Sequence, residues 1–280
     1  PSIVKRGGGI REIWVEEKST DKEGFFIFYV SVDTKEAMGA NMLNTILEAL
    51  LSPIEAMTCG ESIMAILSNL ATNSVVTAKC VLSPRILDTR TTKGEEVISR
   101  IVLASEFSKA DPYRATTHNK GIMNGIDSVV IATGNDWRAI EAGAHAYASL
   151  SGQYQPLTNW TKDEAGNLVG TITLPLPVGT VGGSIAIHPG AQFAHELLGH
   201  PSAVELAGII ASIGLAQNLA AVRALVTDGI QKGHMRLQAK SLGLAVGATE
   251  DELPLLMNLL AKAPHLNQET AKALLEKIRK

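Results

Sequence analysis

Cysteine and an excess of charge of either sign are scarce in this sequence, and each shortage excludes a class of protein. Two cysteines among 280 residues, Cys59 and Cys80, exclude a disulfide scaffold and a zinc site built from several cysteines. We predict that both are reduced thiols in the core of a cytoplasmic protein. The 25 Lys and Arg residues nearly balance the 28 Asp and Glu residues, which argues against a protein that binds nucleic acid by neutralising phosphates.

Long apolar runs and targeting signals are also missing. The least charged stretch, residues 206–222, contains three polar residues and is rich in Ala and Gly, whereas a bilayer span needs roughly 20 predominantly apolar residues. We therefore predict a buried helix there and no membrane segment. Residues 1–6 include neither an initiator Met nor the apolar segment of a signal peptide. This pattern predicts a soluble chain whose start is processed or truncated.

The remaining composition is that of a folded protein with a large core. Hydrophobic residues make up 45% and charged residues 19% of the chain, so extensive disorder is excluded. The length favours one large domain or two to three smaller ones. In the first third we predict strands at 10–18 and 25–32 joined by a hairpin loop at 21–24, a helix at 37–51 that ends before Pro53, strands at 63–67 and 75–81, and a helix at 95–107.

The middle of the chain has a different pattern. Residues 111–121 are polar and lack periodicity, and a buried β-branched run at 129–131 leads into Gly134-Asn135-Asp136-Trp137. Polar residues clustered around a buried element are typical of functional sites. Beyond this region we predict a helix at 139–148, a hairpin around 165–167 and an almost wholly helical chain from His188. Gly229 and Gly233 predict a hinge before a final helical unit at 235–280.

Two well-known motifs are nearly present but do not fit. A zinc-binding helix of the HExxH type needs its histidines at i and i+4. His195 and His200 are five residues apart, so they would lie about 140° apart around a helix. This spacing predicts two ordinary histidines and no metal site. The glycines at 7–9 and 182–183 do not form a G-x-G-x-x-G pattern between a strand and a helix, so a Rossmann cofactor site is not predicted.

Other features carry weak signals when each is taken alone. Glu36 lies at a predicted helix start, where its carboxylate complements the helix dipole. Gly39, inside the same predicted helix, costs roughly 1 kcal/mol relative to Ala, which suggests close approach of a ligand or another backbone. Lys120 and Asp136 are separated by a buried run, and their spacing alone favours two unrelated surface charges. His234 alone favours a structural histidine.

Taken together, four segments closely resemble one family, 3-hydroxy-3-methylglutaryl-coenzyme A reductase. In chain order they occupy residues 36–45, 111–127, 132–138 and 229–235. The Gly-Asn-Asp-Trp sequence is similar to the soluble, prokaryote-type class II, and the resemblance runs from about Gly7 to the C-terminus. It implies an α+β protein with a large, mostly helical substrate domain (1–4 and 69–229), a small sheet-containing, ferredoxin-like cofactor domain (5–68) and a helical C-terminal flap (230–280).

The resemblance also implies roles for individual residues. The catalytic residues of the family map to Lys120, Asp136 and His234, and its substrate contacts map to Ser2, Arg114, Asn124 and Gln217. The family's D-x-M-G-x-N-type motif contacts the nicotinamide dinucleotide, NADH or NADPH. This implies a cofactor site of Glu36, Met38, Gly39, Asn41 and Asn69. Glu36 stands where the family usually has Asp, so the reach of that carboxylate differs.

The implied reaction explains these residue types. The family reduces the thioester 3-hydroxy-3-methylglutaryl-CoA to mevalonate and coenzyme A, or runs the reverse oxidation, and each of two hydride transfers builds negative charge on a carbonyl oxygen. An ammonium such as Lys120, held by Asp136, stabilises that charge, and one such donor is typically worth about 10²–10³ in rate. His234, on a closing flap, would protonate the coenzyme A thiolate that leaves between the two steps.

The start of the chain departs most from the family pattern. Residues 1–4, Pro-Ser-Ile-Val, resemble the end of the Glu-Glu-Pro-Ser segment that carries a catalytic glutamate, joined almost directly to the glycines at 7–9. This implies a glutamate immediately before Pro1 and an incomplete cofactor domain. Two alternatives therefore stay open: a catalytically dead relic that still binds the coenzyme A thioester, and an acyltransferase, for which no nucleophile stands beside a base. The resemblance further implies active sites at the interface of a homodimer or larger assembly.

Overall fold

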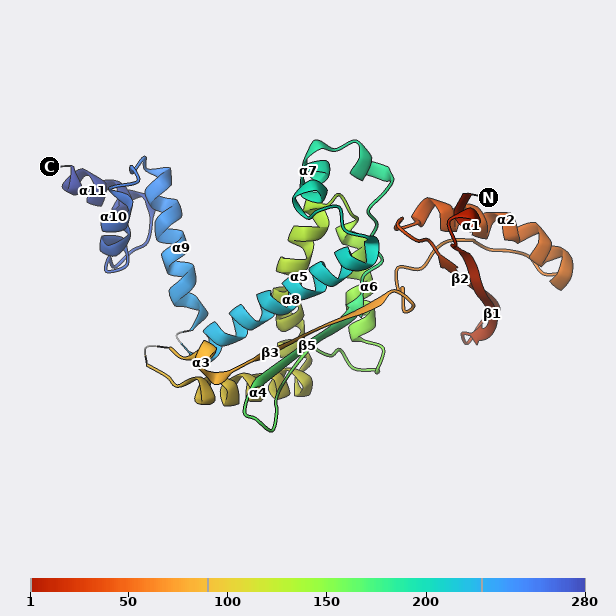
Figure 1. Cartoon of the computed structure of the whole chain (residues 1–280), viewed down its shortest axis with the longest axis horizontal. Helices are drawn as coiled ribbons and strands as arrows, with labels where there is room; N and C mark the ends of the chain where they lie inside the picture. Colours follow the sequence, from red (N-terminus) through yellow and green to blue (C-terminus); the bar gives the residue numbers. More distant parts are fainter. Residues whose placement is uncertain (1, 90, 228, 280) are drawn as a thin grey trace. The chain divides into compact units, whose positions relative to one another are not determined.

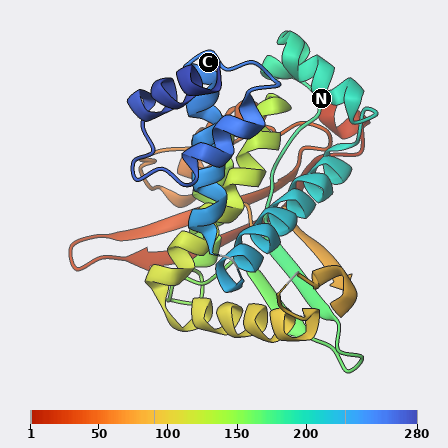
Figure 2. The same cartoon turned by 90° about the vertical axis from the view of Figure 1, so that its left-hand side faces the viewer.

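The computed structural model of the chain describes residues 2–89, 91–227 and 229–279. It divides into two compact units, one formed by Pro1–Thr89 with Lys93–Leu219 and the other by Arg90–Thr92 with Ala220–Lys280. Figures 1 and 2 show the helices and strands of both units. The three domains expected from the sequence, 5–68, 1–4 with 69–229, and 230–280, remain a prediction.

The first unit begins with a short helix and a β-hairpin. Helix α1 (Ser2–Lys5) precedes strands β1 (Gly9–Ser19) and β2 (Gly24–Asp33), which pair antiparallel from Gly9↔Asp33 to Ser19↔Gly24. Aromatic and β-branched side chains favour these strands, and the rings of Trp14 and Tyr29 stack across the pair with centroids 5.0 Å apart. The structure confirms the hairpin predicted from the sequence.

The region after the hairpin corrects two predictions. Helix α2 covers Ala40–Thr58, so Pro53 lies inside the helix and not beyond its end. The helix continues through Pro53 because proline has a helical φ and removes only one backbone donor, although its ring strains the preceding turn. Residues 63–67 form no strand, and the large side chains Ile63, Met64 and Ile66 are exposed. Their apolar character favours a strand, but this segment meets no partner strand with which to pair.

A second, three-stranded sheet lies under most of the helices of the first unit. Strands β3 (Val75–Leu82), β5 (Leu168–Pro175) and β4 (Thr158–Lys162) are antiparallel in the order β3-β5-β4. Leu168, Ile172 and Leu174 alternate along β5 and are fully buried. The ring of Trp160 covers Gly170, where an added Cβ would lie 2.1 Å from the indole. The predicted strand at 75–81 and the hairpin around 165–167 are confirmed.

Besides α1 and α2, the described chain up to Val226 forms five longer helices and the short helix α3. They are α3 (Pro84–Leu87), α4 (Gly94–Ala110), α5 (Pro112–Ala132), α6 (Trp137–Ala148), α7 (Pro189–Leu197) and α8 (Ala203–Val226), with a 3₁₀ turn at Gly183–Ala186. Helix α4 packs on β4 and α6 packs on β5. Figure 1 shows α8 crossing α5, and at this crossing an added Cβ on Gly125 would lie 2.9 Å from Cβ of Gln217.

The polar region that begins at Asp111 forms a single helix, the 21-residue α5 at Pro112–Ala132, which corrects the expectation of an aperiodic segment followed by a buried β-branched run. Asp111 caps its start by accepting from the backbone N–H groups of Tyr113 and Arg114, and Pro112 occupies the first turn. Ala115, Ile122 and Ile126 are buried on one side. The apolar period is therefore present, but polar residues on the other faces obscure it.

Helix α8 corrects a fourth expectation in part. By length and composition α8 is able to cross a membrane, a property that core helices of soluble proteins share, and one third of its most apolar window is buried. Leu206, Ile210 and Leu215 lie in the core, whereas Ile213 and Leu225 are exposed. Residues 206–222 thus form a helix buried on one face only.

The second unit is a small three-helix cluster. Helices α9 (Ile230–Ala245), α10 (Leu253–Leu260) and α11 (Gln268–Ile278) pack around a core of five buried residues: Ala239, Leu256, Leu260, Ala271 and Leu275. The predicted helical end of the chain is confirmed. Gly229 precedes α9 with a φ of 80°, but Gly233 lies inside the helix, so the chain does not bend at both predicted glycines.

The two cysteines differ from the prediction of two core thiols. Cys59 is exposed at the C-terminal end of α2 with a left-handed φ of 54°, because the chain turns there to leave the helix. Cys80 is half-buried on β3, and burial raises the pKa of its thiol. Only Cys80 is therefore close to the expected environment.

Candidate active site

One face of α5 brings together two of the residues predicted to act on a substrate. Lys120 and Asn124 are one helical turn apart, so they share a face, and both are exposed. Tyr113 and Ile131 lie along the same line of the helix with 87% and 58% of their surfaces exposed. Among the described residues, no carboxylate lies within ion-pair distance of the Lys120 ammonium. This open α5 face (Tyr113, Lys120, Asn124 and Ile131) presents a free cation between two exposed apolar side chains.

Asp136, the predicted partner of Lys120, lies elsewhere in the same chain. It caps the start of α6, where its Oδ1 accepts from the backbone N–H groups of Arg138 and Ala139 and lies 3.4 Å from Nε of Arg138. Lys120 is twelve residues before the last residue of α5, which corresponds to about 18 Å along the helix axis. Within one chain, the structure therefore does not bring Lys120 and Asp136 together.

Arg114 and Gln217 flank the open α5 face. Arg114 is half-buried in the first turn of α5, and burial lowers the pKa of its guanidinium. Its charge adds to the burial of His118, one turn further on, and together they lower the pKa of His118 to about 4. Gln217 of α8 packs against Gly125, next to Asn124. Three of the predicted substrate residues thus lie on α5 or against it.

His118 belongs to a buried polar network that the sequence did not reveal. Asn218 of α8 accepts hydrogen bonds from Nε1 of Trp160 (2.7 Å) and Oγ1 of Thr158 (3.0 Å), and its amide nitrogen lies 3.1 Å from Nε2 of His118. Oγ of Ser108 lies 3.3 Å from Nδ1 of His118. This network ties α8, β4 and α4 to α5 and fixes the helix on which Lys120 is carried.

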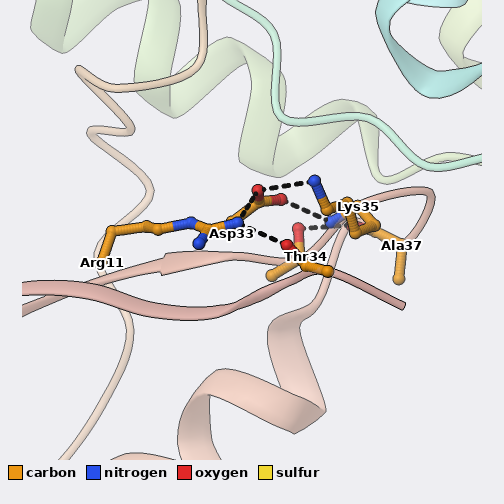
Figure 3. A network of polar contacts seen from close by, with 6 residues as sticks. Arg11, Asp33, Thr34, Lys35 and Ala37 are labelled. Atoms are coloured by element: carbon orange, nitrogen blue, oxygen red, sulfur yellow. Dashed lines mark hydrogen bonds and ion pairs between the residues drawn. The ribbon is translucent and has the colours of Figure 1, made fainter. Parts of the chain in front are cut away.

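The predicted cofactor motif lies in a rigid turn between β2 and α2. Figure 3 shows Asp33 between Arg11 and Lys35, with ion pairs of 2.8 and 3.0 Å, and Oγ1 of Thr34 donating to the carbonyl of Ala37 at 2.7 Å. Arg11 and Lys35 hold the pKa of the Asp33 carboxyl well below its usual range. The network fixes the path of the chain directly before Glu36.

Gly39 has a different role from the one expected. It is not inside the helix but is the residue before α2, with a φ of 92°. An added Cβ would lie 2.4 Å from Cγ2 of Thr34. The close approach predicted at Gly39 is therefore present, and the neighbour is the chain's own Thr34. Glycine is required here by both the left-handed backbone and the space.

Glu36 connects this turn to a loop that is far away in sequence. Its Oε2 accepts from Oγ1 of Thr180 (3.0 Å) and from the backbone N–H of Ala203 (2.7 Å), and its carbonyl accepts from the N–H of Thr180 (2.8 Å). The carboxylate thus caps α8 and not its own helix, which corrects the expected capping role. Glu36, Thr180 and Ile185 line a cavity of about 620 Å³ together with the start of α8.

The loop at 179–185 lies against the predicted cofactor motif, and the sequence analysis did not identify it. An added Cβ on Gly179 would lie 2.5 Å from the backbone nitrogen of Met38, so this loop touches the cofactor motif directly. Asn135 holds the loop from the other side, donating to the carbonyl of Gly179 (3.0 Å) and accepting from its N–H (2.8 Å). The one signal that the sequence offered for this contact was that Asn135 belongs to the Gly-Asn-Asp-Trp segment.

The other predicted cofactor residues do not gather in this cavity. Asn41, on the first turn of α2, lines a separate apolar cavity of about 460 Å³ with Ile3 and Ile10. Asn69 is exposed, and its carbonyl packs against Gly143 of α6. Ser2 in α1 and His234 in α9 have side chains outside the described part of the structure, so their predicted contacts stay predictions.

The remaining histidines do not form a metal site in the described part of the chain. His195 is buried in α7, with Nε2 3.1 Å from the carbonyl of Thr133, and His200 follows the helix with a left-handed φ of 53°. Within the described ranges, no three His, Cys, Asp or Glu side chains are grouped to hold a metal ion.

Comparison with known proteins identifies the class of this α+β chain. The family model described as hydroxymethylglutaryl-coenzyme A reductase matches residues 1–239, and the chain belongs to that family. The chain is also similar, at 57% identity and a TM-score of 0.79, to a class II 3-hydroxy-3-methylglutaryl-CoA reductase from Streptococcus pneumoniae solved with NADPH in open conformations; the match covers 100% of this chain and 68% of that one.

Curated relatives agree with this assignment and are longer. The 3-hydroxy-3-methylglutaryl-coenzyme A reductase of Archaeoglobus fulgidus is 45% identical over 279 residues, which is 100% of this chain and 63% of that protein. The probable 3-hydroxy-3-methylglutaryl-coenzyme A reductase of Borreliella burgdorferi is 40% identical over 242 residues, or 86% of this chain and 55% of that protein. This chain therefore spans roughly three fifths of the length of these relatives.

Proposed function

We propose that the chain carries the substrate-binding part of a cytoplasmic class II reductase that converts 3-hydroxy-3-methylglutaryl-CoA to mevalonate and coenzyme A, or catalyses the reverse. The observation that carries this proposal is the open α5 face, where the Lys120 ammonium is exposed with Asn124 one turn away. A free, fixed cation is suited to stabilise the negative charge that develops on the thioester oxygen. Asn124 and Arg114 are the proposed substrate contacts beside it, with Gln217 and Ser2 completing the set.

The residues around the 620 Å³ cavity fit part of a nicotinamide dinucleotide. Gly179, which has no side chain, brings the loop at 179–185 against the backbone of Met38, and the cavity lies beside this contact. We assign Met38, Gly39 and Asn41 to the cofactor, with Asn69 a further contact; NADH or NADPH supplies the hydride when bound. Glu36 holds the loop at 179–185 against this motif.

The separation of Lys120 from Asp136 supports a homodimer. Because about 18 Å of helix α5 lies between them in one chain, the two residues meet only if Asp136 comes from a second copy. The exposed Tyr113 and Ile131 beside Lys120 are the apolar side chains that such a contact would cover. We therefore propose active sites that combine the open α5 face of one subunit with Asp136 of another.

The two proposed catalytic groups, Lys120 and His234, differ in when they act, and this gives the test. Lys120 stabilises oxygen charge in both hydride steps, whereas His234 gives a proton to the coenzyme A thiolate once. In the natural full-length protein, Lys120→Ala should abolish reduction of both the thioester and added mevaldehyde, by about 10²–10³ in rate. His234→Ala should impair only thioester reduction, because mevaldehyde has no thiol to expel.

The measurement is NAD(P)H oxidation with each substrate, using wild-type protein as the reference. Equal loss of both activities in the His234 variant would contradict the proton-donor role and make this histidine structural. Retention of mevaldehyde reduction in the Lys120 variant would contradict the proposed role of the lysine. Thioester binding without turnover in the wild-type protein would instead favour a relic that has kept only its substrate site.

A further inference from the structure

Two carboxylic acids face each other across helices α5 and α6, outside the site described above. Asp127 lies on α5, and Glu141 lies on α6, close enough for their side chains to hydrogen-bond. Oδ1 of Asp127 is buried and has no hydrogen-bond partner among the described residues if both carboxyl groups are ionised. A buried acceptor without a donor costs stability. A proton placed between the two groups supplies the missing donor.

The groups around this pair leave it without a neutralising cation. Nε2 of His145 lies 3.7 Å from Oε2 of Glu141, and Nδ1 of His145 is engaged with the hydroxyl of Tyr154 at 2.7 Å. Burial raises the pKa of Tyr154, and the charge of Glu141 raises it further. The contact with His145 lies at the long end of ion-pair distances and reaches only Glu141. Asp127 itself therefore faces a carboxyl group and no positive charge.

Among the described residues, Glu141 is the charged group that acts on the Asp127 carboxyl. Strand β5 has no charged residue, and α8 meets α5 through Gln217. On α6, Arg138 is engaged with Asp136. On α4, Glu96 pairs with Arg100 and Glu106 pairs with Lys109 along the helix, and His195 of α7 contacts the carbonyl of Thr133.

The titration of the pair agrees with this geometry. Burial raises the pKa of Asp127 to about 7, and the hydrogen bond with Glu141 and its negative charge act in the same direction. Near neutral pH the pair therefore holds one proton in a large share of the molecules. An ordinary Asp carboxyl, with a pKa of about 3.9, would have lost it.

We propose that Asp127 and Glu141 form a clamp between α5 and α6 that shares one proton and thereby positions Asp136 relative to the open α5 face. Glu141 follows Asp136 by little more than one turn of α6, so a change in the α5–α6 contact moves the start of α6. Loss of the proton leaves two negative charges opposed across the helix contact. Asp127 and Glu141 are positioning residues, and this part of the proposal rests on the proposed function of Asp136.

The clamp makes a signed prediction for stability against pH. The pKa of Asp127 is raised on folding, so its contribution to stability is fully present below about pH 4 and is lost as the pH rises through about 7. Asp127→Asn gives Glu141 a permanent N–H donor of the same shape. The melting temperature of this variant should match the wild type near pH 4, exceed it by a growing amount as the pH rises to about 7, and keep that excess at pH 8. Glu141→Gln should behave in the same way.

Glu106→Gln is the matched control, because it removes one exposed carboxylate that pairs only with Lys109 on α4. Its melting temperature should differ from the wild type by the same amount at every pH. Parallel curves for wild type and Asp127→Asn between pH 5 and 8 would overturn the shared proton. The measurement needs no enzymatic activity, so its result does not depend on the proposed function.

Kinetics test the positioning role. If only the protonated clamp supports catalysis, loss of the shared proton should lower kcat/KM of the wild type about tenfold between pH 6 and 8. Asp127→Asn should not show this decrease. If the pH profiles of kcat/KM coincide for wild type and Asp127→Asn while their melting temperatures diverge with pH, the positioning role is wrong and the shared proton stands. Divergent melting curves in a protein without reductase activity would overturn the proposed function and leave the clamp.

Discussion

Two variants that are each inactive, Lys120→Ala and Asp136→Asn, should regain reductase activity when their subunits are mixed. The reason is the distance between these residues in one chain. About 18 Å of α5 separates Lys120 from the end of the helix, after which Asp136 caps α6. The Lys side chain reaches about 6 Å and the Asp side chain about 3 Å from the backbone. Together they close only half of the gap, so the proposed active sites would draw the two residues from different subunits.

The size of the recovery follows from the symmetry of a dimer. In a mixed dimer one site has both substitutions and the other has neither, so half of its sites are intact. Random exchange at a 1:1 ratio makes half of the dimers mixed, which predicts about one quarter of wild-type activity. Asn is used in place of Asp136 because it still caps α6, and Lys120 is exposed, so both variants should fold.

The assay is NAD(P)H oxidation after subunit exchange, with native mass spectrometry to count mixed dimers. The control replaces Asp136→Asn with the double variant Lys120→Ala/Asp136→Asn, a mixture in which no subunit carries the lysine. That mixture should stay inactive. Mixed dimers with no more activity than their parents would refute the shared site, and activity in the control would show that Lys120 is not needed.

Further predictions concern the scaffold. Gly39→Ala places a Cβ 2.4 Å from Thr34 at a φ of 92° and should lower the free energy of unfolding by about 2 kcal/mol or more in urea titrations. The control is Gly152→Ala, which has a φ of 90° in open space and should lower the free energy of unfolding by less. Equal losses in the two variants would mean that Thr34 moves aside. Asn218→Ala leaves Nε1 of Trp160 without its buried acceptor and removes one hydrogen-bond partner each from Thr158 and His118, so it should cost about 2–3 kcal/mol in the same titration. Asn73→Ala, which removes one exposed hydrogen bond to Ser31, should cost much less, and similar losses for the two variants would show that the buried network adds nothing.

The elements that the sequence predicts well are those whose partners are near in the chain. The hairpin of β1 and β2 has β-branched and aromatic runs on both sides of a short polar turn, so local pattern and pairing agree. Helix α5 was missed because its open face carries polar side chains, Lys120 and Asn124 among them, and these interrupt the apolar period. The polar residues of the open α5 face therefore concealed the helical period in the sequence.

The site was predictable only to the extent that whole motifs resembled a family. Spacing alone gave no reason to connect Lys120 with Asp136, and the structure keeps them apart within one chain. The contact between Glu36 and Thr180 joins residues 144 positions apart. No local pattern encodes such a contact, because it depends on how the loop at 179–185 packs on the turn before α2.

Asn135 and Asp136 are neighbours in the chain that serve different partners. Asn135 forms hydrogen bonds with both the N–H and the carbonyl of Gly179, beside the 620 Å³ cavity. Asp136 caps α6, whose start is proposed to meet a second subunit. A shift of the loop at 179–185 would therefore move Asn135, and with it Asp136, the next residue along the chain. If the loop at 179–185 contacts the dinucleotide as proposed, a loop reshaped for a different dinucleotide would have to keep both hydrogen bonds of Asn135, or the change would reach the proposed contact of Asp136 with a second subunit.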